Sequence, residues 1–203
     1  MQPRKKMNQQ GFTLIEIAIV LTIVGLVIGG IWLAASTVFN NNKQQTLSVD
    51  VIQIMQNTKS LFSGSQGTVT TGFTLANAIA AGVFPSGMVN GALVVQPFAS
   101  NTAVSSVSVT VPSATTLAYT FGAGASAATG LPQSACTNLL TTLGSQNNMT
   151  KLGITSLLAN VGGTAGSDLT TGGTVAVTPA AAAAACSNPA TTDSVSVTFT
   201  PSA

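Results

Sequence analysis

One long apolar segment dominates the first third of the chain. The 23 residues of segment 17–39 include neither a charge nor a proline, and Glu16 is the only charged residue between Met7 and Asn42. About 20 apolar residues are enough for a helix to cross a ~30 Å hydrocarbon core. The pattern therefore predicts a membrane-length helix over residues 12–39.

Beyond this segment the pattern becomes amphipathic. Apolar residues recur at near-helical spacing among the charged residues Lys43, Asp50 and Lys59; these apolar positions are Leu47, Val51, Ile54, Met55, Leu61 and Phe62. We therefore expect a single helix from residue 12 to about residue 63, roughly 78 Å long. Residues 40–63 would form its amphipathic continuation and pack on a head.

Residues 64–203 predict a globular head that mixes helices and strands. One short helix is expected between Thr74 as N-cap and Gly82, and a second one between Cys136 and Gly144. Alternating apolar and hydroxyl residues predict strands over 92–96, 104–111, 117–121 and 194–200, whereas 162–168 and 170–174 have the composition of loops. An antiparallel sheet packed on the long helix follows, which is an α+β fold.

The composition argues against an enzyme. Only 5% of the 203 residues are charged, 45% are hydrophobic, and histidine is absent, which removes the most frequent general base and metal ligand. We expect no catalytic residue, cofactor or metal, because the lone loop acid Asp168 supplies too few carboxylates for calcium. The lysines after residue 11 are scattered, so no nucleic-acid partner is expected.

Three explanations compete for the apolar N-terminal segment: a cleaved secretory signal, an ordinary membrane anchor, or a membrane helix with a later role. Secretory signals have apolar regions of about 7–15 residues, and this segment is too long. The environment of Glu16 distinguishes the two remaining explanations, an ordinary membrane anchor and a membrane helix with a later role. An acid at the edge of lipid either lies among the headgroups or implies a partner.

Glu16 belongs to a recognisable pattern, in which Lys5 and Lys6 precede Gly11-Phe12 and the acid follows four residues after Phe12. This pattern resembles the class III signal of type IV prepilins. The resemblance implies that residues 1–11 are a leader, that a prepilin peptidase cuts between Gly11 and Phe12, and that Phe12 is N-methylated. Cleavage would create an amine one helical turn from Glu16, able to pair within the helix or with Glu16 of a neighbouring subunit.

The two cysteines, Cys136 and Cys186, are too far apart for a catalytic Cys-x-x-Cys motif. A basic leader that stays in the cytoplasm places the head in an oxidising compartment, where a disulfide is expected. Two free, buried thiols are the alternative. A cysteine-closed loop near the C-terminus also resembles the pilin pattern, and its length resembles the heads of type IVb, PilS-like pilins.

The resemblance implies a structural subunit of a type IV pilus, with identical subunits, a prepilin peptidase, an assembly platform and an ATPase as partners. The precursor would sit in the inner membrane with a cytoplasmic N-terminus and a periplasmic head, and the processed subunit would join an extracellular pilus. The alternatives are a pseudopilin of a type II secretion system and a membrane-anchored periplasmic binding module that never polymerises.

Overall fold

The computed structural model describes residues 13–65, 69, 72–100, 102–123, 129–161, 164, 166–187 and 193–201. The chain divides into two compact units, Met1–Asn42 and Lys43–Ala203. Helix α1 (Leu14–Phe62) belongs to both units, and a short 3-10 turn, Ser63–Ser65, follows it. The long helix expected over 12–63 is therefore confirmed over the described residues.

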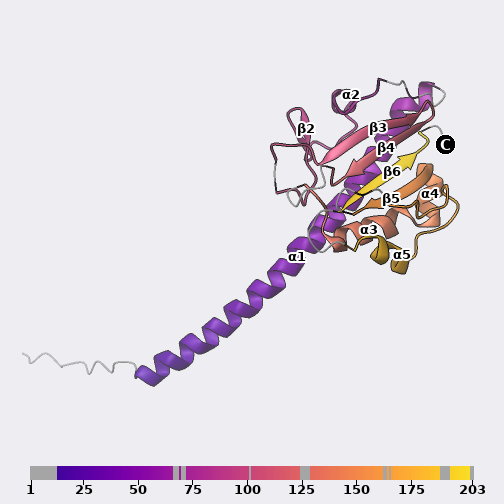
Figure 1. The fold of residues 1–203 in the computed structure, drawn as a ribbon. Coiled ribbons are helices and arrows are strands. Elements are labelled where there is room, and N and C mark those ends of the chain that lie inside the picture. Colours follow the sequence, from indigo (N-terminus) through magenta and orange to yellow (C-terminus); the bar gives the residue numbers. More distant parts are fainter. Residues whose placement is uncertain are drawn as a thin grey trace, which may run out of the picture. The chain divides into compact units, whose positions relative to one another are not determined.

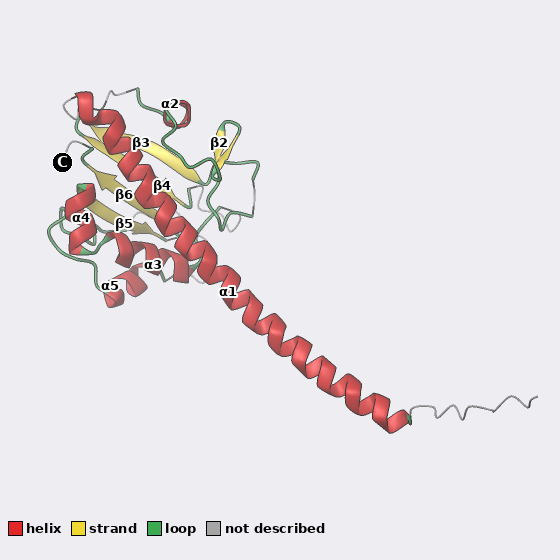
Figure 2. Cartoon of the chain, turned by 180° about the vertical axis from the view of Figure 1, so that it is seen from behind, coloured by secondary structure: helices red, strands yellow, loops and turns green. Residues whose placement is uncertain are grey.

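The second unit is built on an antiparallel sheet (Figure 1). Its strand order is β3 (Val107–Ser113), β4 (Thr116–Phe121), β6 (Ser194–Phe199), β5 (Ile154–Asn160). Every neighbouring pair is antiparallel. The part of α1 that belongs to this unit lies across one face of the sheet (Figure 2), which confirms the predicted α+β architecture.

The core lies between this part of α1 and the sheet. The helix buries Leu47, Val51, Ile54, Met55 and Phe62 at spacings of three to four residues or two turns. The sheet contributes every second residue of its strands to the core, because successive side chains on a strand point to opposite faces. The fully buried residues of β4 and β6 are Leu117, Tyr119, Phe121, Val195, Val197 and Phe199. The positions between them hold three hydroxyl residues and one alanine, which are Thr120, Ser196, Thr198 and Ala118.

Small helices complete the second unit. Helix α2 (Leu75–Ala80) begins at its predicted N-cap, where the Thr74 side chain accepts a hydrogen bond from the Asn77 amide, and Gly82 follows it with φ +69°. Helix α3 (Gln133–Leu143) ends at Gly144, also as predicted. Capping signals were therefore sufficient for α2. In α3, Pro132 provides no side-chain cap and Gly144 has φ −77°, so only the end of this helix agrees with the prediction.

Other elements differ from the sequence prediction. The strand expected over 92–96 is only β2 (Leu93–Val94), paired with β1 (Val89–Asn90), and β3 begins three residues later than expected. Besides β1, the prediction missed α4 (Gln146–Leu152), β5 and α5 (Pro179–Ala185). β5 lacks strict alternation because it is buried at Ile154, Leu157 and Ala159, and an alanine run has no apolar periodicity to reveal a helix.

Candidate functional site

The N-terminal part of α1 presents a continuous apolar surface. Within the first unit, the described residues are exposed on all sides of the helix except at half-buried Ala35. Even Trp32 is 80% exposed. The helix is long and apolar enough to cross a membrane by length and composition. A helix that is apolar all round needs an apolar environment, either lipid or other protein.

Glu16 is the single charged residue of this surface. It lies in the first turn of α1, where the helix dipole favours an acid, and the Thr13 hydroxyl donates a 3.5 Å hydrogen bond to its Oε2. Glu16 is exposed, so neither carboxylate oxygen is held firmly within the chain. The expected cleavage residues Gly11 and Phe12 lie outside the described residues.

Three glycines, Gly25, Gly29 and Gly30, lie in the middle of the apolar surface. The helix continues through all of them, although each weakens a helix by about 1 kcal/mol relative to alanine. A Cβ added at any of the three would meet nothing within 4 Å. Packing within the chain therefore does not require these glycines, and their lack of a side chain leaves the helix backbone open to close approach.

A disulfide closes the C-terminal loop of the head. Cys136 on α3 and Cys186, the C-cap of α5, are joined with their Cα atoms 5.9 Å apart, and both residues are fully buried. The bond fastens α5 against α3, consistent with their adjacency in Figure 1. The disulfide expected from the sequence is present, in place of the alternative of two free thiols.

Asp193 lies beside this disulfide. Its side chain is fully buried, and a carboxylate oxygen and the two sulfur atoms lie within 4.8 Å of one another. Its backbone carbonyl accepts a 2.8 Å hydrogen bond from the Leu131 amide, which ties the segment before α3 to the start of β6. Because both sulfurs are used in the disulfide, neither can act as a thiolate ligand for a metal.

Asp168, the loop acid considered for calcium, has a structural role. Its Oδ1 accepts hydrogen bonds from the Leu157 amide, the Thr170 amide and the Thr170 hydroxyl, and its Oδ2 accepts one from the Gly172 amide. Burial acts to raise the pKa of the carboxyl, but these hydrogen bonds outweigh it and hold the pKa below its ordinary value. The donors occupy the directions from which a cation would approach.

The loop around Asp168 covers the outer edge of β5. The Leu169 amide donates to the Leu157 carbonyl over 2.9 Å. Gly166 and Gly173 lie so close to the backbone of β5 that a Cβ at either position would collide with it. Sequence reasoning missed this arrangement, although the Asp168-Leu169-Thr170 spacing is typical of a side chain that caps its own backbone two residues on.

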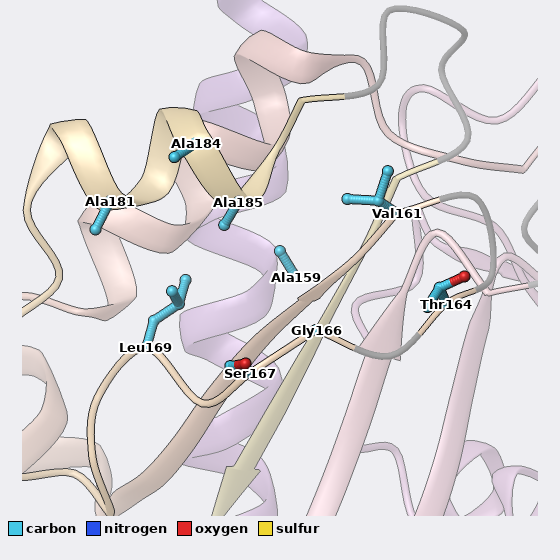
Figure 3. A pocket seen from close by; sticks show the side chains of 9 residues that line it. All are labelled: Ala159, Val161, Thr164, Gly166, Ser167, Leu169, Ala181, Ala184 and Ala185. Atoms are coloured by element: carbon cyan, nitrogen blue, oxygen red, sulfur yellow. The ribbon is translucent and has the colours of Figure 1, made fainter.

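An apolar cavity of about 480 Å³ lies between this loop and α5. Figure 3 shows the Leu169 and Ala185 side chains directed into the space, with Ala159 beneath them and Val161 at one side. Ser167 and Thr164 supply its only lining hydroxyls, and no ionisable side chain lines it among the described residues. The described lining therefore offers no base that could activate either hydroxyl as a nucleophile.

Comparison with known families agrees with the N-terminal pattern. The prokaryotic N-terminal methylation motif matches residues 6–32. The family described as PilS N terminal matches residues 41–202, well over half of the chain. No significant match was found to a curated protein or to a solved structure. Both matched families are structural, pilin-type families, and neither is an enzyme family. The chain thus belongs to the PilS family, as a pilin-type protein with a prepilin methylation motif, which confirms the resemblance seen in its Gly11-Phe12 and Glu16 pattern.

Proposed function

We propose that this protein is a structural subunit of a type IV pilus and polymerises through its N-terminal helix after a prepilin peptidase removes residues 1–11. The observation that carries the proposal is the exposed apolar surface of α1 between Leu14 and Phe39. Neither a water-exposed helix nor a packed head accounts for such a surface. Lipid around the precursor and the helices of other subunits around the assembled protein do.

The same surface suits the two environments that such a subunit must visit. In the precursor it would contact the acyl chains of the inner membrane, and in the filament it would contact the helices of neighbours. Both environments are apolar, so the exchange carries no large net hydrophobic penalty. The free energy needed to extract the subunit would come from the assembly platform and its ATPase.

Glu16 would set the axial register of the subunits. Cleavage after Gly11 leaves an amine on Phe12, four residues before Glu16 in an otherwise uncharged segment. In the filament core, the amine of one subunit would pair with Glu16 of the next. A buried acid without a partner is costly, so a subunit in the wrong register would be disfavoured.

The head would then form the outer surface of an extracellular pilus. Removal of the leader, with Arg4, Lys5 and Lys6, changes the formal charge of the chain from +2 to −1. A head with so few charges can be packed at high density without bringing many like charges together. The disulfide is consistent with the oxidising conditions outside the inner membrane.

Isolation of surface filaments tests the proposal. Filaments sheared from cells that express the protein should contain it as their main component, with Phe12 as the first residue and a methylated amine, as read by mass spectrometry. A processed protein confined to the membrane of cells without filaments would point instead to a pseudopilin. An intact leader on a membrane-bound protein would point to an anchored binding module.

A further inference from the structure

The head has few charges, and most of them are already engaged. After Asn42 the chain contains three lysines and three aspartates, which are Lys43, Lys59, Lys151, Asp50, Asp168 and Asp193. Asp168 accepts hydrogen bonds from its own loop and from β5, and Asp193 is buried beside the disulfide. Asp50 differs from both, because its carboxylate makes no hydrogen bond or ion pair with the residues that the structure describes.

Asp50 lines a recess of about 430 Å³ on one side of α1. The facing wall comes from the segment that contains the β1–β2 hairpin, including Pro85, Met88 and Asn90. Partial burial removes water from the carboxylate and raises its pKa above the ordinary value of 3.8. No basic side chain is found among the described residues that line the recess. The Asp50 carboxylate could therefore pair with a cation that another molecule supplies.

Among the three lysines of the head, all of which the structure describes, Lys151 is the one available to supply that cation. The Lys43 ammonium lies 5.8 Å from the centre of the Phe98 ring, a cation–π geometry. Lys59 donates a 3.1 Å hydrogen bond to the Lys151 carbonyl. Lys151 itself is exposed, and its ammonium makes no hydrogen bond, ion pair or ring contact within the described part of the chain.

Asp50 and Lys151 lie on opposite sides of the head. Asp50 and Lys59 are nine residues apart on α1, about 2.5 turns, so their side chains leave the helix in opposite directions. Lys151 belongs to α4, beside Lys59. Figure 2 shows the same arrangement, with β2 on one side of α1 and α4 on the other. The two groups therefore cannot meet within one copy.

We propose that the Asp50 recess of one copy receives the Lys151 ammonium of a second copy. This inference rests on the proposed function, since it identifies a contact between heads in the filament. A donor on one side and an acceptor on the other make a heterologous interface, and such interfaces produce helical filaments when they do not close into rings. Because other head charges are engaged, this pair would fix the rotation of each head relative to the next.

Carbodiimide coupling tests the contact in wild-type filaments. The reagent joins a carboxylate to an amine only where the two touch, so we expect a covalent dimer whose linked peptides contain Asp50 and Lys151. The detergent-solubilised subunit is the control and should give no such product. Coupling of Asp50 to another lysine, or filaments that give other acid–amine products without this one, would overturn the proposal.

Charge reversal provides an independent test. Asp50→Lys and Lys151→Asp should each lower the amount of sheared filament by about tenfold or more, because like charges then face each other. The double variant should restore most of it. Lys151→Arg is the matched control, because it keeps the positive charge at the same position, and it should have a much smaller effect. Single reversals without loss, or a double variant without recovery, would overturn the proposal.

Two further measurements separate the causes of a defect. Processing at Phe12 and the thermal stability of the solubilised subunit should be unchanged in both single variants, which excludes misfolding. If the wild-type protein itself forms no filaments, the proposed function fails. If wild-type filaments form but lack the Asp50–Lys151 product, only this inference fails.

Discussion

The hydroxyl groups of Thr58 on α1 and Tyr119 on β4 lie 2.9 Å apart in the core of the head. Both residues are fully buried. The Thr58 hydroxyl also donates a 2.7 Å hydrogen bond to the Ile54 carbonyl, so its proton is used there and the Tyr119 hydroxyl is the donor between the two. This chain of hydrogen bonds, from Tyr119 to Thr58 to the Ile54 carbonyl, joins α1 to the sheet within an otherwise apolar part of the core.

Replacement of the two hydroxyls should have unequal effects. In Tyr119→Phe, Thr58 retains its bond to Ile54, and we expect a loss of about 1 kcal/mol in the free energy of unfolding. In Thr58→Val, the buried Tyr119 hydroxyl loses its acceptor, and the loss should be about 2 kcal/mol or more. Chemical denaturation of the solubilised subunit measures both. Equal losses would contradict the assigned donor.

Tyr119 also predicts an alkaline loss of stability. Burial raises the pKa of its hydroxyl above the ordinary value of 10.0. The folded state therefore holds its proton more tightly than the unfolded state, and this contribution to stability is complete below pH 10 and lost as the pH rises beyond it. In Tyr119→Phe, the free energy of unfolding should fall less between pH 9 and 11 than in the wild type.

Asp168 predicts the opposite dependence. Because hydrogen bonds hold its pKa below 3.8 in the folded state, its contribution is complete above that value and disappears as the pH falls through the lowered pKa. Asp168→Asn should therefore be less stable than the wild type at pH 7, by about 1 kcal/mol, since the group is partly exposed to solvent. The difference should shrink below pH 4. A difference that is constant with pH would show that the charge is not involved.

Loss of the disulfide should weaken the head without affecting the N-terminal helix. The chain-entropy account gives about 4 kcal/mol for a loop of this length. Cys136→Ala, Cys186→Ala and the double variant should lose similar amounts, because each removes the same bond. Thermal unfolding with and without reductant measures the effect, and the wild type under reductant should approach the variants. Native filaments whose cysteines react with an alkylating reagent would contradict the prediction.

Substitution of Glu16 separates a register role from a headgroup position. Glu16→Ala should be inserted and cut normally, since neither step uses the acid, but should join wild-type filaments poorly. Loss of one partner of a buried pair costs about 3–5 kcal/mol, whereas an exposed pair costs under about 1 kcal/mol. The measurement is the variant fraction in filaments from cells that make both proteins. Incorporation of the variant at the wild-type level would contradict the proposed role of Glu16 in setting the register.

Local sequence patterns were sufficient to predict the parts of this protein that depend on neighbouring residues. The long helix follows from the uninterrupted apolar segment and its amphipathic continuation. α2 follows from Thr74 and Gly82 at its ends, and α3 follows from the helical spacing of its apolar residues. The family follows from the spacing of Gly11, Phe12 and Glu16. Each of these signals comes from residues that are close together in the sequence, so it can be recognised without knowledge of the tertiary contacts.

Features that depend on contacts between distant residues could not be predicted and are set by how the chain folds. β5 becomes a strand because β6 pairs with it and the Asp168 loop covers its edge, and neither partner is visible in its own seven residues. Thr58 and Tyr119 are 61 positions apart, and only the packing of α1 on the sheet brings their hydroxyls together. Likewise, the opposite placement of Asp50 and Lys151 depends on where α4 docks beside Lys59. Side-chain burial and long-range pairing, which no local pattern encodes, set these relationships.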